Sequence, residues 1–210
     1  MGVYIDVNTD NNIFENNFEY TINKLCNILS KKLYIFEKDK YHYPYNYKEY
    51  LIVKLDYGNN IDEEILVEPN IHITIYDELY NLDFIMSKSC IHYYHDFSYK
   101  WHVFKNYLKG DNNIFDKNIE EIIHFSRIFK STEILIHGDD YYEEEIYNKI
   151  MQGEYISDIM KNNNLPYISD IPNKYMNNEI DIFYRKIDVK PIFDINEWLD
   201  YFKKTSRHIA

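Results

Sequence analysis

Residues 71–76 alternate between isoleucine and side chains that are polar or aromatic, in the order Ile-His-Ile-Thr-Ile-Tyr. Successive side chains of a strand point to opposite faces of a sheet, so this pattern predicts a strand with one buried face and one wetter face. Residues 50–55 are also strand-like, and the turn-forming triplet Gly58-Asn59-Asn60 lies between the two segments. We therefore expect a hairpin-like pair in a sheet that is covered on one face.

The other apolar patterns place strands mostly early in the chain and helices mostly late. Strands are predicted at residues 3–7, 33–36, 82–86, 133–137 and 180–187, and helices at residues 13–32, 97–109, 116–129, 141–152, 155–161 and 195–204. This order favours an α+β fold with a mixed or largely antiparallel sheet, a strand-rich N-terminal half, a helix-rich C-terminal half and helices mainly on one face. We expect a single domain over residues 1–210, with residues 109–113 as the place where it would divide.

The amino-acid composition limits how the aromatic residues are interpreted. The chain has a single alanine, Ala210, against 32 isoleucines, 24 asparagines and 23 tyrosines. Isoleucine, asparagine and tyrosine have A+T-rich codons, whereas alanine and glycine have G+C-rich codons. The composition therefore indicates an A+T-rich genome, which we expect to be bacterial, and part of the tyrosine content reflects codon usage and not function.

The charge of the chain excludes some partners and favours others. The formal net charge is −12 at pH 7, and lysine and arginine are nowhere clustered, so we expect no nucleic-acid partner. A basic surface on another protein would be attracted by this charge. No run of about 18 apolar residues and no secretory signal is visible, so we expect no membrane partner. Cys26 and Cys90 lie far apart in apolar surroundings, which is typical of buried thiols in a cytoplasmic protein.

An acidic segment follows the predicted strand that ends at His137. Asp139 and Asp140 come first, and Glu144 is among five acids within seven positions. These carboxylates could hold Mg²⁺ or Ca²⁺, or contact a basic partner protein. The alternative is that Asp140 is the N-cap of the following helix and forms a capping box with Glu143. Consecutive glutamates on a helix point about 100° apart and cannot all face one ion, so the capping interpretation is favoured.

A second polar cluster contains three histidines within eleven residues. His92, His95 and His102, with Asp96 between them, are residue types that bind zinc or iron. Their spacing is not that of a metalloprotease helix, because no glutamate lies between histidines four residues apart. The alternative, which we favour, is that the histidines are hydrogen-bonding partners of the surrounding tyrosines.

Tyrosines alternate with other residues between positions 41 and 47. If this segment is extended, Tyr41, Tyr43, Tyr45 and Tyr47 share one face. Tyrosine offers a large contact area and a hydroxyl group, so such a face suits the recognition of another protein. Pro44 would confine the segment to an edge strand or a loop. The alternative is a loop whose tyrosines pack over the core.

Three functional hypotheses follow. The first is a small acidic cytoplasmic protein that acts by binding another protein with a basic surface, for which a toxin-neutralising immunity protein would be one class. The second is a divalent-metal-dependent hydrolase or nuclease-like enzyme that uses the turn from His137 to Asp140, with the three histidines as further ligands. The third is a structural subunit of an oligomeric assembly. We expect no cofactor, except a divalent metal under the second hypothesis.

Overall fold

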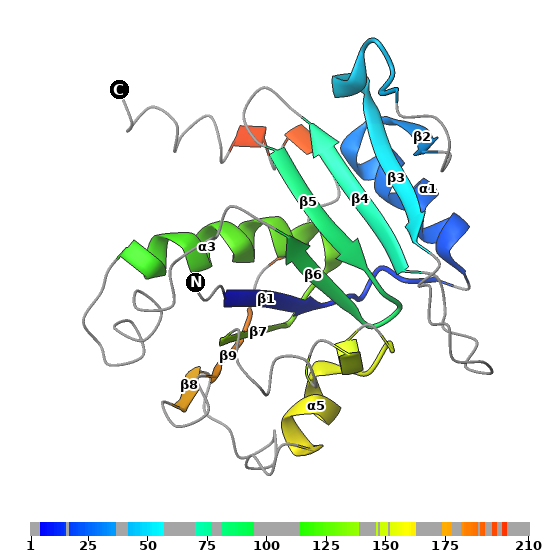
Figure 1. Cartoon of the computed structure of the whole chain (residues 1–210). Helices are drawn as coiled ribbons and strands as arrows, with labels where there is room; N and C mark the ends of the chain where they lie inside the picture. The colour runs from blue at the N-terminus through cyan, green and yellow to red at the C-terminus, as the bar shows by residue number, and fades with distance from the viewer. Residues whose placement is uncertain are drawn as a thin grey trace, which may run out of the picture.

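The computed structural model contains a nine-stranded mixed sheet (Figure 1). Its strands are β1 (Ile5–Asp10), β2 (Lys32–Phe36), β3 (Tyr50–Asp56), β4 (Asn70–Tyr76), β5 (Asn81–Met86), β6 (Cys90–Tyr94), β7 (Glu133–Gly138), β8 (Lys174–Asn177) and β9 (Ile182–Lys186). The described helices are α1 (Phe18–Leu29), α3 (Ile114–Ser126), α5 (Ile156–Asn162) and the short 3₁₀ helices η1 (Tyr47–Glu49) and η2 (Arg127–Phe129). The structure describes residues 5–15, 17–36, 42–56, 70–76, 81–94, 114–138, 146, 148–150, 152–162, 174–177, 182–188, 190–191, 195–196 and 199–200.

The strands follow the order β2-β3-β4-β5-β6-β1-β7-β9-β8 across the sheet. β2 and β3 are parallel, and the other seven pairings are antiparallel. β1 lies between β6 and β7, so strands from both sides of residues 109–113 belong to the same sheet. This is the α+β fold with a mixed, largely antiparallel sheet that the sequence predicts.

One face of the sheet packs against α1 and α3. Ile71, Ile73 and Ile75 of β4 are fully buried on this face, whereas the side chains between them are partly exposed. The buried residues of α1 and α3 belong to the same core cluster as these isoleucines. The alternation in residues 71–76 therefore marks the covered face, as predicted.

The helix α1 begins at Phe18, five residues after its predicted start. Asn17 has an extended backbone (φ −158°, ψ 172°) and its side-chain oxygen accepts a hydrogen bond from the backbone N–H of Tyr20. This is an N-cap, which satisfies one of the donors that a helix leaves free at its first turn. At the other end Ser30 adopts a left-handed conformation with φ 52° and closes the helix.

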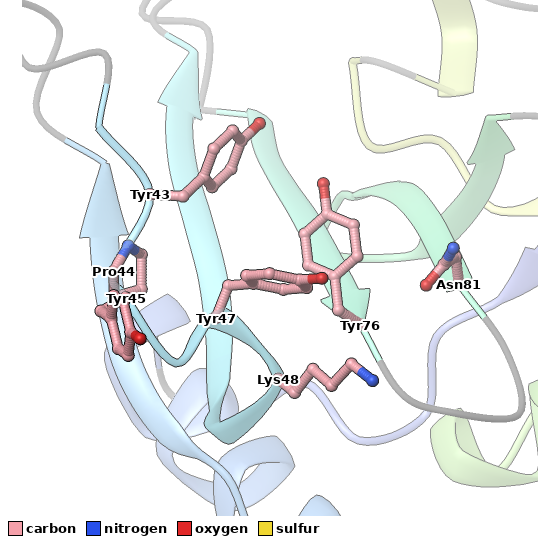
Figure 2. A pocket seen from close by; sticks show the side chains of 7 residues that line it. All are labelled: Tyr43, Pro44, Tyr45, Tyr47, Lys48, Tyr76 and Asn81. Atoms are coloured by element: carbon pink, nitrogen blue, oxygen red, sulfur yellow. The ribbon is translucent and has the colours of Figure 1, made fainter.

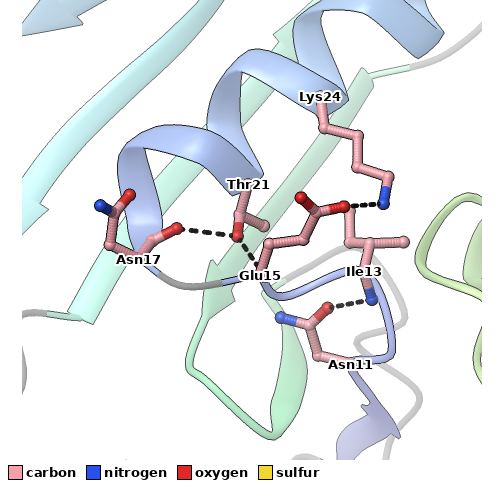
Figure 3. Close-up of polar contacts among 6 residues, drawn as sticks. All are labelled: Asn11, Ile13, Glu15, Asn17, Thr21 and Lys24. Atoms are coloured by element: carbon pink, nitrogen blue, oxygen red, sulfur yellow. Dashed lines mark hydrogen bonds and ion pairs between the residues drawn. The ribbon is translucent and has the colours of Figure 1, made fainter.

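Side chains hold the residues before α1 against the helix (Figure 3). The hydroxyl of Thr21 accepts a hydrogen bond from the backbone N–H of Glu15 at 3.0 Å and donates one to the carbonyl of Asn17 at 3.0 Å. Glu15 also forms an ion pair with Lys24. The backbone N–H groups of Ile13 and Glu15 thus bind side-chain oxygens of Asn11 and Thr21 without being helical, although the apolar spacing of residues 13–15 continues that of α1.

The opposite face of the sheet is covered over β6, β7 and β9 by α5 and by helical residues between 146 and 150. A second core cluster lies there, made up of Cys90, Leu135, Ile146, Ile150, Ile156, Ile159, Met160, Ile182 and Tyr184. The strand β9 is consequently buried on both faces. Gly153, which has a φ of +81°, follows these helical residues, at the position where the sequence predicts a helix end.

The two halves of the chain differ less in secondary structure than the sequence suggests. Six strands precede residue 95, but β7, β8 and β9 follow it. The sequence patterns give no indication of β6 or β8, whereas β2, β5, β7, β9, α3 and α5 lie where they are predicted. The predicted helix at residues 97–109 lies outside the described residues.

Candidate functional site

The tyrosine-rich segment is part of the connection between the two parallel strands. A chain that leaves β2 must return to the other end of the sheet before it can enter β3 in the same direction. Residues 42–49 of this connection form no strand: they contain a turn at residues 45–46 and then η1. The carbonyl of His42 accepts a hydrogen bond from the hydroxyl of Tyr34 at 2.8 Å, which ties the connection to β2. The position of Pro44 in a loop agrees with the sequence analysis.

Two of the tyrosines converge on a third that the sequence analysis does not single out. Tyr43 and Tyr47 point towards Tyr76 at the end of β4, whereas Tyr45 points away from it (Figure 2). The rings of Tyr43 and Tyr76 are 6.2 Å apart with an interplanar angle of 88°, and those of Tyr47 and Tyr76 are 5.1 Å apart at 78°. Both are edge-to-face contacts, which stabilise aromatic pairs beyond their buried area. Tyr43, Tyr45 and Tyr47 therefore do not share one face of an extended segment.

These residues surround an open pocket of about 680 Å³ (Figure 2). Its lining consists of Tyr43, Pro44, Tyr45, Tyr47, Lys48, Tyr76 and Asn81, which we call the tyrosine pocket. Tyr43, Tyr45 and Tyr47 are 56, 99 and 42% exposed. Burial raises the pKa of Tyr76, and the charge of the neighbouring Tyr43 and a hydrogen bond with its hydroxyl act in the same direction.

Two lysines belong to the described surroundings of the pocket. Lys48 lines the pocket directly. The ammonium group of Lys31 donates hydrogen bonds to the carbonyl oxygens of Lys48 at 2.6 Å and Tyr76 at 2.8 Å, which places a second positive charge beside it.

Exposed apolar side chains gather around the same edge of the sheet. β2 is the terminal strand of the described sheet, and its Leu33 and Ile35 are exposed. Together with Tyr43, Tyr45 and Tyr47 they make up five of the eight large hydrophobic side chains that are exposed in the described part of the chain. The strand register places Leu33 and Ile35 on the same face of the sheet as Ile75, whereas Tyr76 and the pocket lie on the opposite face, so exposed apolar side chains flank this edge on both sides.

A second candidate region is a buried polar network that joins three strands. Asn8 of β1 is placed opposite His92 of β6 by the strand register. Its amide oxygen lies 2.8 Å from Nδ1 of His92, and its amide nitrogen lies 3.2 Å from Nε2 of His137 in β7. All three residues are buried. The structure thus connects two histidines that belong to separate motifs in the sequence.

The hydrogen bonds of this network run in one direction. If Nδ1 of His92 donates to Asn8, the Asn8 amide donates to Nε2 of His137, whose Nδ1 lies 3.3 Å from the carbonyl of Gly138. The His137 imidazole, which accepts at Nε2, is then neutral with its proton on Nδ1. Burial lowers the pKa of His92 to about 4, although Asp6, whose carboxylate lies 3.8 Å from Nε2, acts in the opposite sense. This arrangement explains the two histidines as mutually satisfied interior groups.

Most of the proposed metal ligands, and some of the proposed binding residues, lie outside the part of the chain that the structure describes. Asp139, Asp140, Glu144, His95 and His102 lie outside the described residues, and so does Tyr41. Of the residues that the structure describes, no group of three or more histidines, cysteines, aspartates or glutamates is arranged to hold a metal ion. His92 takes part in the network with Asn8, and not in a described cluster of metal ligands.

The two cysteines are reduced and buried, as the sequence predicts. Burial raises the pKa of the Cys26 thiol to about 11 and that of Cys90 to about 12. The Cys90 thiol also donates to the carbonyl of Glu154 at 3.3 Å. Neither thiol is therefore suited to act as a nucleophile.

Comparisons of the chain with protein-family models, curated proteins and solved structures find no match. Within the described ranges, none of the helices has the length and apolar character that crossing a membrane requires.

Proposed function

We propose that this protein acts by binding another protein through the tyrosine pocket and the neighbouring β2 edge. The observation that carries the proposal is the arrangement of Tyr43, Tyr47 and Tyr76, whose rings are held by mutual edge-to-face contacts around an open pocket. Side chains that are already ordered lose little conformational freedom on binding, so more of the contact energy appears as affinity.

The composition of the surface agrees with a recognition role. Tyrosine is enriched at the energetic centres of protein interfaces, because it combines a large apolar ring with a hydroxyl group. The exposed Leu33 and Ile35 add apolar surface on the other face of the same terminal strand. Truncation of a central tyrosine at such an interface costs about 2 kcal/mol or more of binding free energy.

We further propose that this protein is cytoplasmic. A toxin-neutralising immunity protein is one class of protein that would fit this proposal. The two buried thiols support the location. The net charge of −12 supports an overall attraction to a basic partner. That attraction would act through acidic parts of the surface, and contact through the tyrosine pocket would then fix the complex.

A display library of random peptides of fixed length tests the binding surface. We expect clones enriched on the wild-type protein to be lost on the variant Tyr43→Ala/Tyr45→Ala/Tyr47→Ala. The control is Tyr20→Ala/Tyr155→Ala, which removes tyrosines that are 59 and 54% exposed at unrelated positions. Clones that bind the triple variant and the wild type equally would overturn the proposal, as would an absence of enrichment.

The second candidate is a divalent-metal-dependent hydrolase, and it is supported only by the acidic segment that follows His137 in the sequence, because His92 and His137 are themselves linked through Asn8. His137 precedes the acidic residues Asp139 and Asp140 in the sequence by only two and three positions. A bound metal at about 100 times its Kd would stabilise the fold by roughly 2.7 kcal/mol. Thermal unfolding with Mg²⁺, Mn²⁺ or Zn²⁺ should then show a rise that Asp140→Asn abolishes. A wild-type midpoint that no metal changes removes this candidate.

A further inference from the structure

We propose that the partner protein contributes an extended segment, which pairs with the edge of β2 as a further strand of the sheet. This inference rests on the proposed protein-binding function and adds the way in which the partner is recognised. In the described part of the sheet, β2 and β8 are the terminal strands, and β2 pairs with β3 on one side only. The backbone N–H and C=O groups on the other side of a terminal strand can bind a strand of another chain.

Exposed side chains flank this edge on both faces of the sheet. The strand register places the exposed Leu33 and Ile35 on the face that packs against α1. On the opposite face Tyr34 and Phe36 are partly exposed, and the ring of Phe36 lies 5.9 Å from that of Tyr43 in the tyrosine pocket. Successive side chains of a strand alternate between the two faces, so one added strand would contact both groups of residues. A helix that packs on one face would reach only one of them.

The sequence of β2 has little that would keep another strand away. Proteins guard terminal strands with prolines, bulges or charged side chains. The charged residue of β2, Lys32, is at its first position, and the pairing with β3 runs through all five residues without a bulge. At the other end of the described sheet, β8 has a single exposed large hydrophobic side chain, Met176. Of the two terminal strands, β2 therefore offers the better edge to a partner strand.

The charge of the protein favours a different protein over a second copy as the source of this strand. Each copy has a formal net charge of −12, so two copies repel each other. A different protein can present a basic surface to the acidic chain, as the proposed function requires. The added strand would then fix the position of the partner at β2, because its backbone pairing and its alternating side chains both depend on the register.

Backbone methylation of a probe peptide tests the inference by fluorescence anisotropy. The probe is the peptide of the most enriched clone from the display library, made also in two N-methylated versions. One version is methylated on the odd-numbered residues and the other on the even-numbered residues, so each keeps one complete edge of the strand. A strand that is added to β2 uses only one of its two edges. We expect one version to bind within about threefold of the probe and the other at least about tenfold more weakly.

Amide exchange locates the pairing on the wild-type protein. In the free protein, the N–H groups of β2 that point away from β3 should exchange quickly with solvent. The bound probe should slow the exchange of these groups at least about tenfold. Slow exchange of every β2 amide in the free protein would show that the edge is already covered, and it would overturn the inference.

Two matched variants distinguish the terminal strands. Leu33→Lys places a charge on the β2 edge and should weaken the probe at least about tenfold. The control is Met176→Lys on β8, because Leu33 and Met176 are both 37% exposed, and it should leave the affinity unchanged. A loss of affinity in Met176→Lys alone would overturn the placement on β2. Unfolding curves show whether the variants are folded, and the methylated peptides need only the wild-type protein.

The remaining outcomes separate the inference from the function on which it rests. Equal affinities of the two methylated versions would overturn the added strand, but the protein-binding function would stand as long as the clones require the tyrosines. Absence of enrichment, or clones that are indifferent to the tyrosine substitutions, would remove the proposed function itself. In sedimentation experiments we expect a monomer. A dimer that Leu33→Lys dissociates would assign the edge to a second copy and overturn the choice of a partner strand.

Discussion

The ring of Tyr47 meets the ring of Tyr76 edge to face, with 5.1 Å between their centroids, although 29 positions separate the two residues in the chain. Tyr76 ends β4, and Tyr47 begins the 3₁₀ helix that leads into β3. The antiparallel pairing of β3 and β4 brings the start of one strand beside the end of the other. The tyrosine pocket is therefore built on a strand pair whose register is set by the core.

We predict a measurable coupling between these two rings. Edge-to-face aromatic pairs are worth about 0.5–1.5 kcal/mol beyond their buried area. In a double-mutant cycle of Tyr47→Leu and Tyr76→Leu, urea unfolding should give a coupling energy of this size. Tyr20 and Tyr47, which lie in α1 and η1, serve as an unrelated pair that should be additive. A coupling near zero for Tyr47 and Tyr76 would contradict the contact.

Replacement of Asn8 by leucine should be strongly destabilising. The leucine side chain has a similar volume but leaves two buried imidazole nitrogens, on His92 and His137, without this partner. Each unsatisfied buried polar group costs about 1–3 kcal/mol, so the free energy of unfolding should fall by roughly 2–5 kcal/mol. Asn23→Leu on the exposed side of α1 is the matched control and should change it little. Equal effects of the two substitutions would show that the network does not stabilise the fold.

Stability should depend on pH through His92. Its pKa is about 4 in the folded protein and near 6.5 when unperturbed. Between these values the unfolded chain binds more protons than the folded one, so stability is retained above about pH 6.5 and is lost as the pH falls towards 4. The loss attributable to His92 amounts to about 3 kcal/mol at most. His92→Gln removes this titration. The free energy of unfolding of the variant should therefore change less with pH between about 4 and 6.5 than that of the wild type. Parallel curves for the two proteins would show that His92 titrates normally.

Both thiols should be unreactive in the folded protein. With pKa values of about 11 for Cys26 and about 12 for Cys90, almost no thiolate exists at neutral pH. We expect a thiol-specific disulfide reagent to modify neither cysteine in the native state and both in denaturant. Cys26→Ser should leave one reactive group in denaturant and still none in the native state. Rapid native labelling would mean that one of the thiols is exposed or activated.

The sequence predicts those helices and strands in which the spacing of apolar residues matches the side that is buried. The alternation in β4 and the apolar stripe of α3 are of this kind, because one side of each element is buried. β1 is different: the apolar pattern ends at Val7, yet the strand continues to Asp10, with Asn8 and Thr9 fully buried. Polar residues in such a central strand are satisfied by other strands, and no local pattern reveals those partners.

The residues of the two candidate sites are likewise predictable only where they form a local pattern in the sequence. Tyr43, Tyr45 and Tyr47 are recognisable from their spacing, but Tyr76 and Asn81 join them only through the pairing of β3, β4 and β5. Likewise, the meeting of His92 with His137 requires β1 between β6 and β7. Since β6 itself was not predicted, the register that connects the two histidines could not be anticipated.

The central position of β1 has a consequence for how the chain folds. Ribosomes produce β1 early, but its two neighbours, β6 and β7, begin at residues 90 and 133. β1 therefore cannot pair with β6 before residue 94 has been synthesised, nor with β7 before residue 138. Contacts between such distant parts of a sequence slow folding. We expect the middle of this sheet to form after β2 to β5 have already paired with one another.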